Sequence, residues 1–132
     1  MGVRPVNPGE ASAARYSEAV EVDLGSARML FVSGHIARDA DGDVVGVGDT
    51  EAQVREIFRQ IDELLRSAGG ALEDVIRTTV YLTDMREIDQ VRAVRDAVDW
   101  KVAPATTAVE VSHLIDPGLR VVIDAVAVIP AS

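Results

Sequence analysis

Side chains that can transfer a proton stand beside a small-residue segment in the first third of the chain. Ser33 and Gly34 end an apolar run, and His35 follows them directly. Imidazole gains and loses its proton near neutral pH, so His35 is a candidate proton shuttle; its alternative role is to pack or to face solvent. Tyr16 combines a ring with a hydroxyl group and can contact a ligand or simply pack. Glu110 is a candidate general base, or the partner of an arginine across an interface.

The sequence offers little to a metal ion or a nucleotide cofactor. His35 and His113 lack the spacing of metal ligands, and the chain has no cysteine. The acidic run 39–43 lacks the glycine and glutamate positions of a calcium loop, so a turn is the better interpretation. Gly46 and Gly48 have no third glycine at dinucleotide-binding spacing. We therefore expect neither a metal site nor a cofactor.

Alternating or continuous apolar residues indicate the strands that must position these side chains. The expected strands are residues 15–22, 28–34, 44–47, 75–83, 106–112 and 119–129. Gly25-Ser26 predicts a hairpin turn between the first two strands, and the segment 116–118 predicts a turn between the last two. Residues 1–14 contain Pro5 and Pro8, and we interpret them as a partly mobile entry segment.

Two helices are expected between these strands. Thr50 and Gln53 have the spacing of a capping box, apolar residues then recur at three- and four-residue steps as far as Ala68, and glycines end the helix. Asp84 can cap the second helix. The face of that helix consists of Ile88, Val91, Val94 (or Arg95) and Val98.

The order of the elements predicts an α/β (α+β) fold. Two antiparallel strands followed by βαβ units give a mixed sheet with both helices on one face. The strand at 119–129 is nearly all apolar, so we expect it in the middle of the sheet. Residues 1–132 are expected to form one domain. No helix remains to cover the other face of the sheet, and self-association is the simplest way to cover it.

The net charge and the hydropathy of the chain argue against nucleic acids and membranes as partners. The net charge is −9, with 22 acidic against 13 basic residues. Such a chain repels phosphate backbones unless its basic residues cluster, and here they are scattered, so no nucleic-acid partner is expected. No apolar run approaches about 18 residues and no signal pattern opens the chain, so we expect no membrane contact and a cytoplasmic protein.

Several segments, taken in order, resemble the Rid family, also called YjgF or L-PSP endoribonucleases. They are Tyr16-Ser17, Val32-Ser33-Gly34, Val80 to Met85, Pro104-Ala105 and Ile123 to Ala127. The resemblance covers residues 15–128. It implies a chorismate-mutase-like fold of the bacillus type, a homotrimer, and a small-molecule cleft at each subunit interface.

The resemblance also implies site residues. Deaminases of the family hydrolyse imines or enamines such as 2-aminoacrylate, and an arginine directly after Pro-Ala grips the substrate carboxylate. Thr106 occupies that arginine position, and Val122 occupies the position of a water-positioning glutamate. Tyr16 matches the family's tyrosine, and Ser33-Gly34 its serine-glycine turn, whose backbone contacts substrate.

The second helix contributes further candidates. Arg92 and Arg95 align with an asparagine and a tyrosine of the family, and they can restore the lost cation or form surface ion pairs with nearby aspartates. Trp100 either anchors the loop before Pro104 or forms a pocket wall.

Three functions are compatible with these residues. The leading one is a trimeric Rid-like enzyme acting on an imine, enamine or related carbonyl compound, larger or less dependent on its carboxylate than aminoacrylate. The first alternative is a non-catalytic ligand-binding or regulatory protein. The second alternative is an interaction scaffold.

Overall fold

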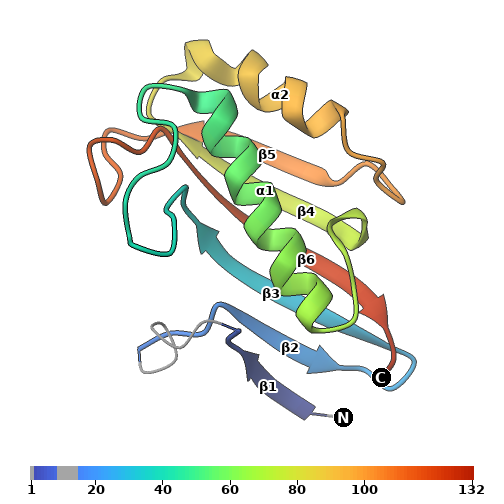
Figure 1. The fold of residues 1–132 in the computed structure, drawn as a ribbon. Coiled ribbons are helices and arrows are strands. Elements are labelled where there is room, and N and C mark those ends of the chain that lie inside the picture. The colour runs from blue at the N-terminus through green and yellow to red at the C-terminus, as the bar shows by residue number, and fades with distance from the viewer. Residues whose placement is uncertain (1, 9–14) are drawn as a thin grey trace.

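The computed structural model describes residues 2–8 and 15–132 and contains one mixed sheet with both helices on the same face (Figure 1). The six strands have the order β1-β2-β3-β6-β4-β5, and only β4 and β5 pair in parallel. The strands are β1 (Gly2–Val6), β2 (Ala19–Asp23), β3 (Ala27–His35), β4 (Val75–Leu82), β5 (Ala105–Glu110) and β6 (Val121–Pro130). The helices are α1 (Thr50–Ser67) and α2 (Ile88–Asp96), with short 3₁₀ turns η1 (Leu72–Asp74) and η2 (Met85–Glu87).

The last strand lies in the middle of the sheet, as its apolar sequence predicted. β6 pairs with β3 on one side and with β4 on the other. Its alternate residues, from Val121 to Ile129, are buried beneath the helices. Val122 and Val126 are only half-buried and Val128 is exposed, because they point to the face that no helix covers.

The start of α1 differs from the predicted capping box. Asp49 is the N-cap, and its carboxylate accepts a hydrogen bond of 3.0 Å from the backbone N–H of Ala52. The Gln53 side chain is fully buried and binds elsewhere: its amide nitrogen donates to the carbonyl of Gly118 at 2.9 Å, and its oxygen accepts from the N–H of Arg120 at 2.7 Å. Gln53 therefore ties the helix to the loop that leads into β6.

The expected entry segment is in part a strand. Residues 2–6 form β1 at the edge of the sheet, antiparallel to β2, whereas residues 1 and 9–14 lie outside the described residues. Pro5 is tolerated because an edge strand has one side without sheet hydrogen bonds. The carboxylate of Glu21, buried on β2, forms ion pairs with Arg4 of β1 at 2.8 Å and with Arg28 of β3 at 2.8 Å. This ion cluster spans all three strands.

Two strand predictions need correction. Residues 44–47 form only an isolated bridge between Arg38 and Val44 rather than a strand. The strand expected at 15–22 begins only at Ala19, so Tyr16 stands in the connection before β2. The hairpin turn was predicted correctly: Gly25 has a φ of 89°, and the N–H of Leu24 donates to the carbonyl of Ala27 at 2.9 Å.

The sheet face without helices is largely apolar. Phe31 on β3 pairs with Val20 on β2 and with Val126 on β6. Further along the sheet, Tyr81 on β4 pairs with Val122 on β6 and with Val109 on β5. Phe31 keeps 47% of its surface exposed and Val3 keeps 71%. None of the helices in the described part of the chain combines the length and apolar character needed to cross a membrane.

Candidate functional site

All but two of the predicted site residues, Glu110 and Val122, divide between two pockets on different parts of the chain. One, the His35 pocket, has a cavity volume of about 400 Å³ and is lined by Tyr16, Ser33, Gly34 and His35. The other, the α2 pocket, has a cavity volume of about 420 Å³ and is lined by Arg92, Arg95 and Thr106. Within one chain, these two groups do not line a common cavity.

The end of β3 positions Tyr16 in the His35 pocket. β2 starts opposite Val32, so the last residues of β3 are paired instead by the segment before β2. Ser33 makes both contacts: its backbone N–H donates to the carbonyl of Glu18 at 2.9 Å, and its hydroxyl donates to the carbonyl of Ser17 at 2.7 Å. The Ser33 hydroxyl therefore holds the Tyr16 segment in place. Tyr16 itself keeps 62% of its surface exposed.

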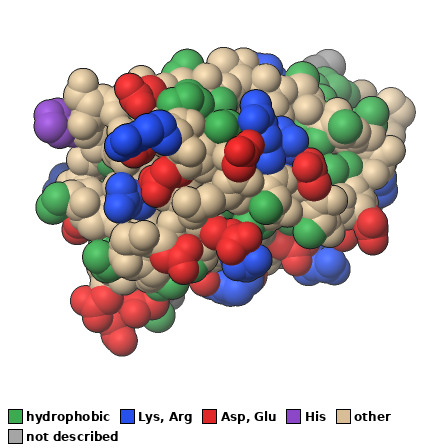
Figure 2. Space-filling view, turned by 90° about the horizontal axis from the view of Figure 1, so that it is seen from above, with side chains coloured by type: hydrophobic (Ala, Val, Ile, Leu, Met, Phe, Trp, Pro, Cys, Tyr) green, Lys and Arg blue, Asp and Glu red, His purple; other side chains and the backbone are tan. Residues whose placement is uncertain are grey.

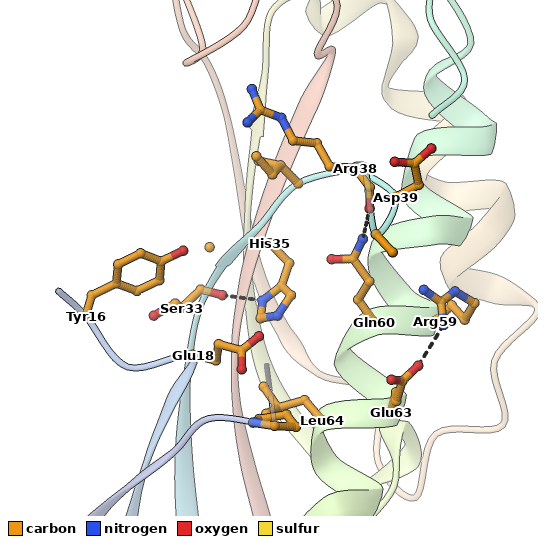
Figure 3. Close-up of a pocket in the computed structure, with 14 residues that line it drawn as sticks. Tyr16, Glu18, Ser33, His35, Arg38, Asp39, Arg59, Gln60, Glu63 and Leu64 are labelled. Carbon is orange, nitrogen blue, oxygen red and sulfur yellow. Dashed lines mark hydrogen bonds and ion pairs between the residues drawn. The ribbon is translucent and has the colours of Figure 1, made fainter. Parts of the chain in front are cut away.

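The imidazole of His35 has a fixed hydrogen bond on one side. Its Nδ1 lies 2.8 Å from the carbonyl oxygen of Ser33 (Figure 3). A carbonyl oxygen can only accept, so Nδ1 carries the hydrogen in this contact. In the neutral imidazole the lone pair is then on Nε2, which suits that atom to take a proton from a ligand or water.

Polar and charged side chains of α1 line the same pocket, on the side of the helix (Figure 3). Arg59 pairs with Glu63 at 2.7 Å and with Glu56 at 2.8 Å, and it lowers the pKa of Glu56 below its usual value chiefly through that hydrogen bond. Gln60 donates to the carbonyl of Arg38 at 3.0 Å. Sequence reasoning missed these residues, because they belong to the polar face of α1 and carried no motif.

Arg38 brings a further donor to this pocket. One terminal nitrogen of its guanidinium lies 3.2 Å from the Asp116 carboxylate. Its Nε is buried and makes no hydrogen bond with the described part of the chain. Leaving a buried donor unpaired costs free energy, so an acceptor from water or a ligand is favoured there.

An apolar side chain occupies the place that the resemblance assigns to a glutamate. A Cβ built on Gly34 would come within 2.9 Å of Val122 Cγ1, so the two residues are in close contact. Asp124, two residues further along β6, lies 3.4 Å from the Tyr81 hydroxyl. The negative charge of Asp124 raises the pKa of Tyr81 above its usual value. No carboxylate therefore stands at residue 122 itself.

The α2 pocket lies between α2 and the strands β4 and β5. Thr106 lines it from β5, with its hydroxyl 2.9 Å from that of Thr78. Arg92 pairs with Asp89 at 3.1 Å, and Arg95 pairs with Asp96 at 3.0 Å. These are the surface ion pairs that were the alternative to ligand binding. Both arginines nevertheless line the cavity.

Trp100 fills both of the roles considered for it. Its indole N–H donates to the carbonyl of Arg95 at 2.9 Å, which anchors the loop after α2. Its ring also lines the α2 pocket and meets Phe58 edge to face, with the ring centres 5.9 Å apart.

Glu110 stands apart from both pockets. Its carboxylate accepts a hydrogen bond of 2.9 Å from the backbone N–H of Met85 at the start of η2. It lines neither the His35 pocket nor the α2 pocket. Within one chain, this contact supports the turn into α2.

The acidic run after β3 has the form of a turn. Carboxylates of Asp39, Asp41 and Asp43 lie within 4.8 Å of one another. One oxygen of Asp39 accepts hydrogen bonds of 3.0 Å from the backbone N–H groups of both Asp41 and Asp43. The Asp39 carboxylate is thus used to close the turn.

The charge around α2 is mixed. Seen from that side, basic side chains lie among acidic ones with apolar groups between them (Figure 2). On this face the basic side chains do not form a continuous band of the kind that binds a phosphate backbone.

Comparison with known proteins places this fold and these residues in a family. A profile described as Endoribonuclease L-PSP matches residues 7–129. The crystal structure of Rv2704 from Mycobacterium tuberculosis, a member of the YjgF/YER057c/UK114 family, is 35% identical, with a TM-score of 0.77 over 96% of this chain and 98% of its own. YjgF structures have the chorismate-mutase-like fold, which this chain shares.

Two relatives have names that state a reaction. The 3-aminoacrylate deaminase RutC of Acinetobacter baylyi is 32% identical over 86% of each chain. The 2-iminobutanoate/2-iminopropanoate deaminase of Mus musculus is 31% identical over 86% of this chain and 80% of its own. The chain therefore belongs to the endoribonuclease L-PSP family, the family of the YjgF and Rid proteins.

Proposed function

We propose that this protein is a homotrimer that hydrolyses a reactive imine or enamine in clefts between its subunits. Relatives named as deaminases support the reaction class. The apolar face of the sheet supports the assembly, because exposed apolar area of this kind is typical of interfaces. In the proposed trimer, the α2 pocket of one copy lies beside the His35 pocket of the next, which reunites the two groups of site residues.

The observation that carries the proposed reaction is the hydrogen bond from His35 Nδ1 to the Ser33 carbonyl, at 2.8 Å. It directs the Nε2 lone pair to accept a proton. Water attacks the imine carbon, its proton goes to Nε2, and the C=N electron pair moves to nitrogen. The imidazolium returns that proton to the nitrogen, which gives a carbinolamine. The hydroxyl proton of the carbinolamine then passes through Nε2 to the amine, the C–N bond breaks as the C=O bond forms, and ammonia leaves with a carbonyl product remaining. Tyr16 can hydrogen-bond to the substrate from the same pocket.

The substrate is proposed to differ from that of a standard 2-imino acid deaminase. Thr106 offers a neutral hydroxyl where the family's deaminases hold the carboxylate with a guanidinium. Loss of such a charge-assisted pair is worth about 2–5 kcal/mol of binding free energy. A small imino acid has few other groups from which to regain it, so the substrate must be larger or bound in another way.

The test is a hydrolysis assay on a panel of imino acids generated in place by an amino-acid oxidase. His35→Gln should lower kcat by about a hundredfold or more, since general acid–base groups contribute roughly 10²–10⁴-fold. His113→Gln is the matched control, because the chain has two histidines and His113 lines a separate pocket, with the loop that leads into β6. Equal effects of the two substitutions, or no hydrolysis across the panel, would refute the proposed reaction.

A ligand-binding protein without turnover is the second candidate. The close contact of Val122 with Gly34 favours this second candidate. An isopropyl group cannot position the attacking water as a carboxylate does. A compound that raises the melting temperature and is recovered unchanged would support this alternative.

A further inference from the structure

The α2 pocket is a cavity that a single chain forms by itself. Its volume of about 420 Å³ falls within the roughly 300–1,000 Å³ of small-molecule sites. α2 forms one wall and the strands β4 and β5 form the floor. Thr106 and Ala108, at alternate positions on β5, line this floor with small side chains that leave the cavity open.

Most of the residues that line the pocket are apolar. Phe58 and Trp100 meet edge to face there, and the buried Val80 and Val91 lie beside them. The one polar atom of Trp100 already donates to the carbonyl of Arg95, so its ring offers carbon surface to the cavity. Water in such a space makes few hydrogen bonds, and its replacement by an apolar group is favourable.

The charges at this pocket are of one sign. Arg92 and Arg95 line it, and none of its lining residues in the described chain is acidic. The acidic partners, Asp89 and Asp96, stand outside the cavity with 88% and 68% of their side chains exposed. Ion pairs this exposed contribute little free energy, so a guanidinium can turn from its aspartate to an anionic ligand at small cost.

We propose that the α2 pocket binds a carboxylate with an aryl or branched alkyl side chain. The side chain lies against the apolar wall that Phe58 and Trp100 form together, and the carboxylate binds Arg92. If the proposed function holds, the natural ligand of this pocket is the substrate, a 2-imino acid with a large apolar side chain. Only this identification of the ligand as a substrate rests on the proposed function. The binding itself is a property of one chain and requires no turnover.

Trp100 reports directly on this site, because it is the only tryptophan of the sequence. The probe is 3-phenylpropanoate, titrated into the 132-residue protein while the indole emission is followed. Propanoate lacks the ring and 3-phenylpropanamide lacks the charge. We expect each of them to bind about tenfold more weakly or worse, the loss expected for an apolar group or a charge-assisted hydrogen bond.

Three variants assign the contacts. Arg92→Gln should weaken 3-phenylpropanoate by about tenfold and leave the amide unchanged, whereas Ala108→Leu should weaken both by filling the cavity. Arg55→Gln is the matched control, since Arg55 is an exposed arginine that pairs with Glu51 on α1. Calorimetry gives the affinities, and unchanged melting temperatures show that the variants are folded.

The outcomes separate this inference from the proposed reaction. Indole emission that does not respond to 3-phenylpropanoate, equal binding of propanoate, or full affinity in Arg92→Gln would overturn the pocket assignment. A protein that binds the probe at Trp100 but hydrolyses no imine would uphold the pocket and refute the reaction. A protein that hydrolyses imines but whose indole emission does not respond to the probe would uphold the reaction and refute the pocket assignment.

Discussion

At the scale of single residues, short polar side chains hold the segments around the candidate site in place. The Ser33 hydroxyl donates to the Ser17 carbonyl and supports the segment that carries Tyr16. The sequence predicts Thr50 as the cap of α1, but the neighbouring Asp49 is the N-cap, and the Thr50 hydroxyl donates to Glu87 at 2.8 Å. Ser, Thr and Asp cap helices similarly well, so sequence alone does not choose between adjacent ones.

Introducing the arginine that the resemblance implies directly after Pro104-Ala105 tests the role proposed for residue 106. Thr106→Arg should raise kcat/KM for a small imino acid such as 2-iminopropanoate by tenfold or more, because a guanidinium binds a carboxylate through two hydrogen bonds. Steady-state kinetics of the two proteins with the same oxidase-generated substrate measures the effect. Thr106→Val removes the hydroxyl without adding charge and should give no increase. If both variants behave alike, residue 106 does not contact the carboxylate.

At the scale of elements, the helices and the central strand followed from local patterns, and the first strand did not. Short-range periodicity predicted both helices because each has one continuous apolar face. β1 has no such signal: it contains Pro5, and its contacts are with residues far along the chain, such as Glu21. Contacts between residues far apart in the sequence produce no periodic pattern within the strand itself, so local patterns do not predict them.

The ion cluster at β1, β2 and β3 makes stability depend on pH. The hydrogen bond from Arg4 is the largest cause that holds the pKa of Glu21 below its usual value of 4.5. A lowered carboxylate pKa means that the stabilisation is complete above the unfolded value and is lost as the pH falls through the folded one. Glu21→Gln should cost about 3–5 kcal/mol of unfolding free energy near pH 7, since it leaves Arg28 buried without its partner.

Urea unfolding at several pH values measures this effect. The difference between the natural chain and Glu21→Gln should shrink as the pH drops below the ordinary glutamate range. Glu63→Gln is the control, because Glu63 pairs with Arg59 at the surface and keeps 72% of its side chain exposed. A difference that does not change with pH would show that the Glu21 charge is not what stabilises the cluster.

At the scale of the whole molecule, the fold class and the central strand could be predicted, but the complete site could not. The apolar sequence of β6 was enough to place it at the centre of a mixed sheet, which the structure confirms. The site residues lie in two pockets of the same chain, and no pattern within one sequence states how copies of it associate. Which residues meet across an interface depends on the assembly.

A charge placed on the open face of the sheet tests the proposed trimer. The natural protein should scatter light as three times its chain mass of 14.1 kDa. Phe31→Glu should shift it to the monomer, because burying an unpaired carboxylate among apolar side chains is unfavourable. Ile115→Glu is the matched control: Ile115 is 81% exposed in the loop between β5 and β6. A monomeric natural protein, or a trimeric Phe31→Glu variant, would contradict the proposal.

The buried amide of Gln53 has one more consequence, for the backbone outside the sheet. Arg120 precedes β6, where amide protons would ordinarily be replaced quickly by deuterium in heavy water. Its N–H instead donates to Gln53 Oε1 at 2.7 Å, inside a contact that joins α1 to this loop. Deuterium should therefore enter at Arg120 as slowly as in a core strand, and Gln53→Leu should release that protection.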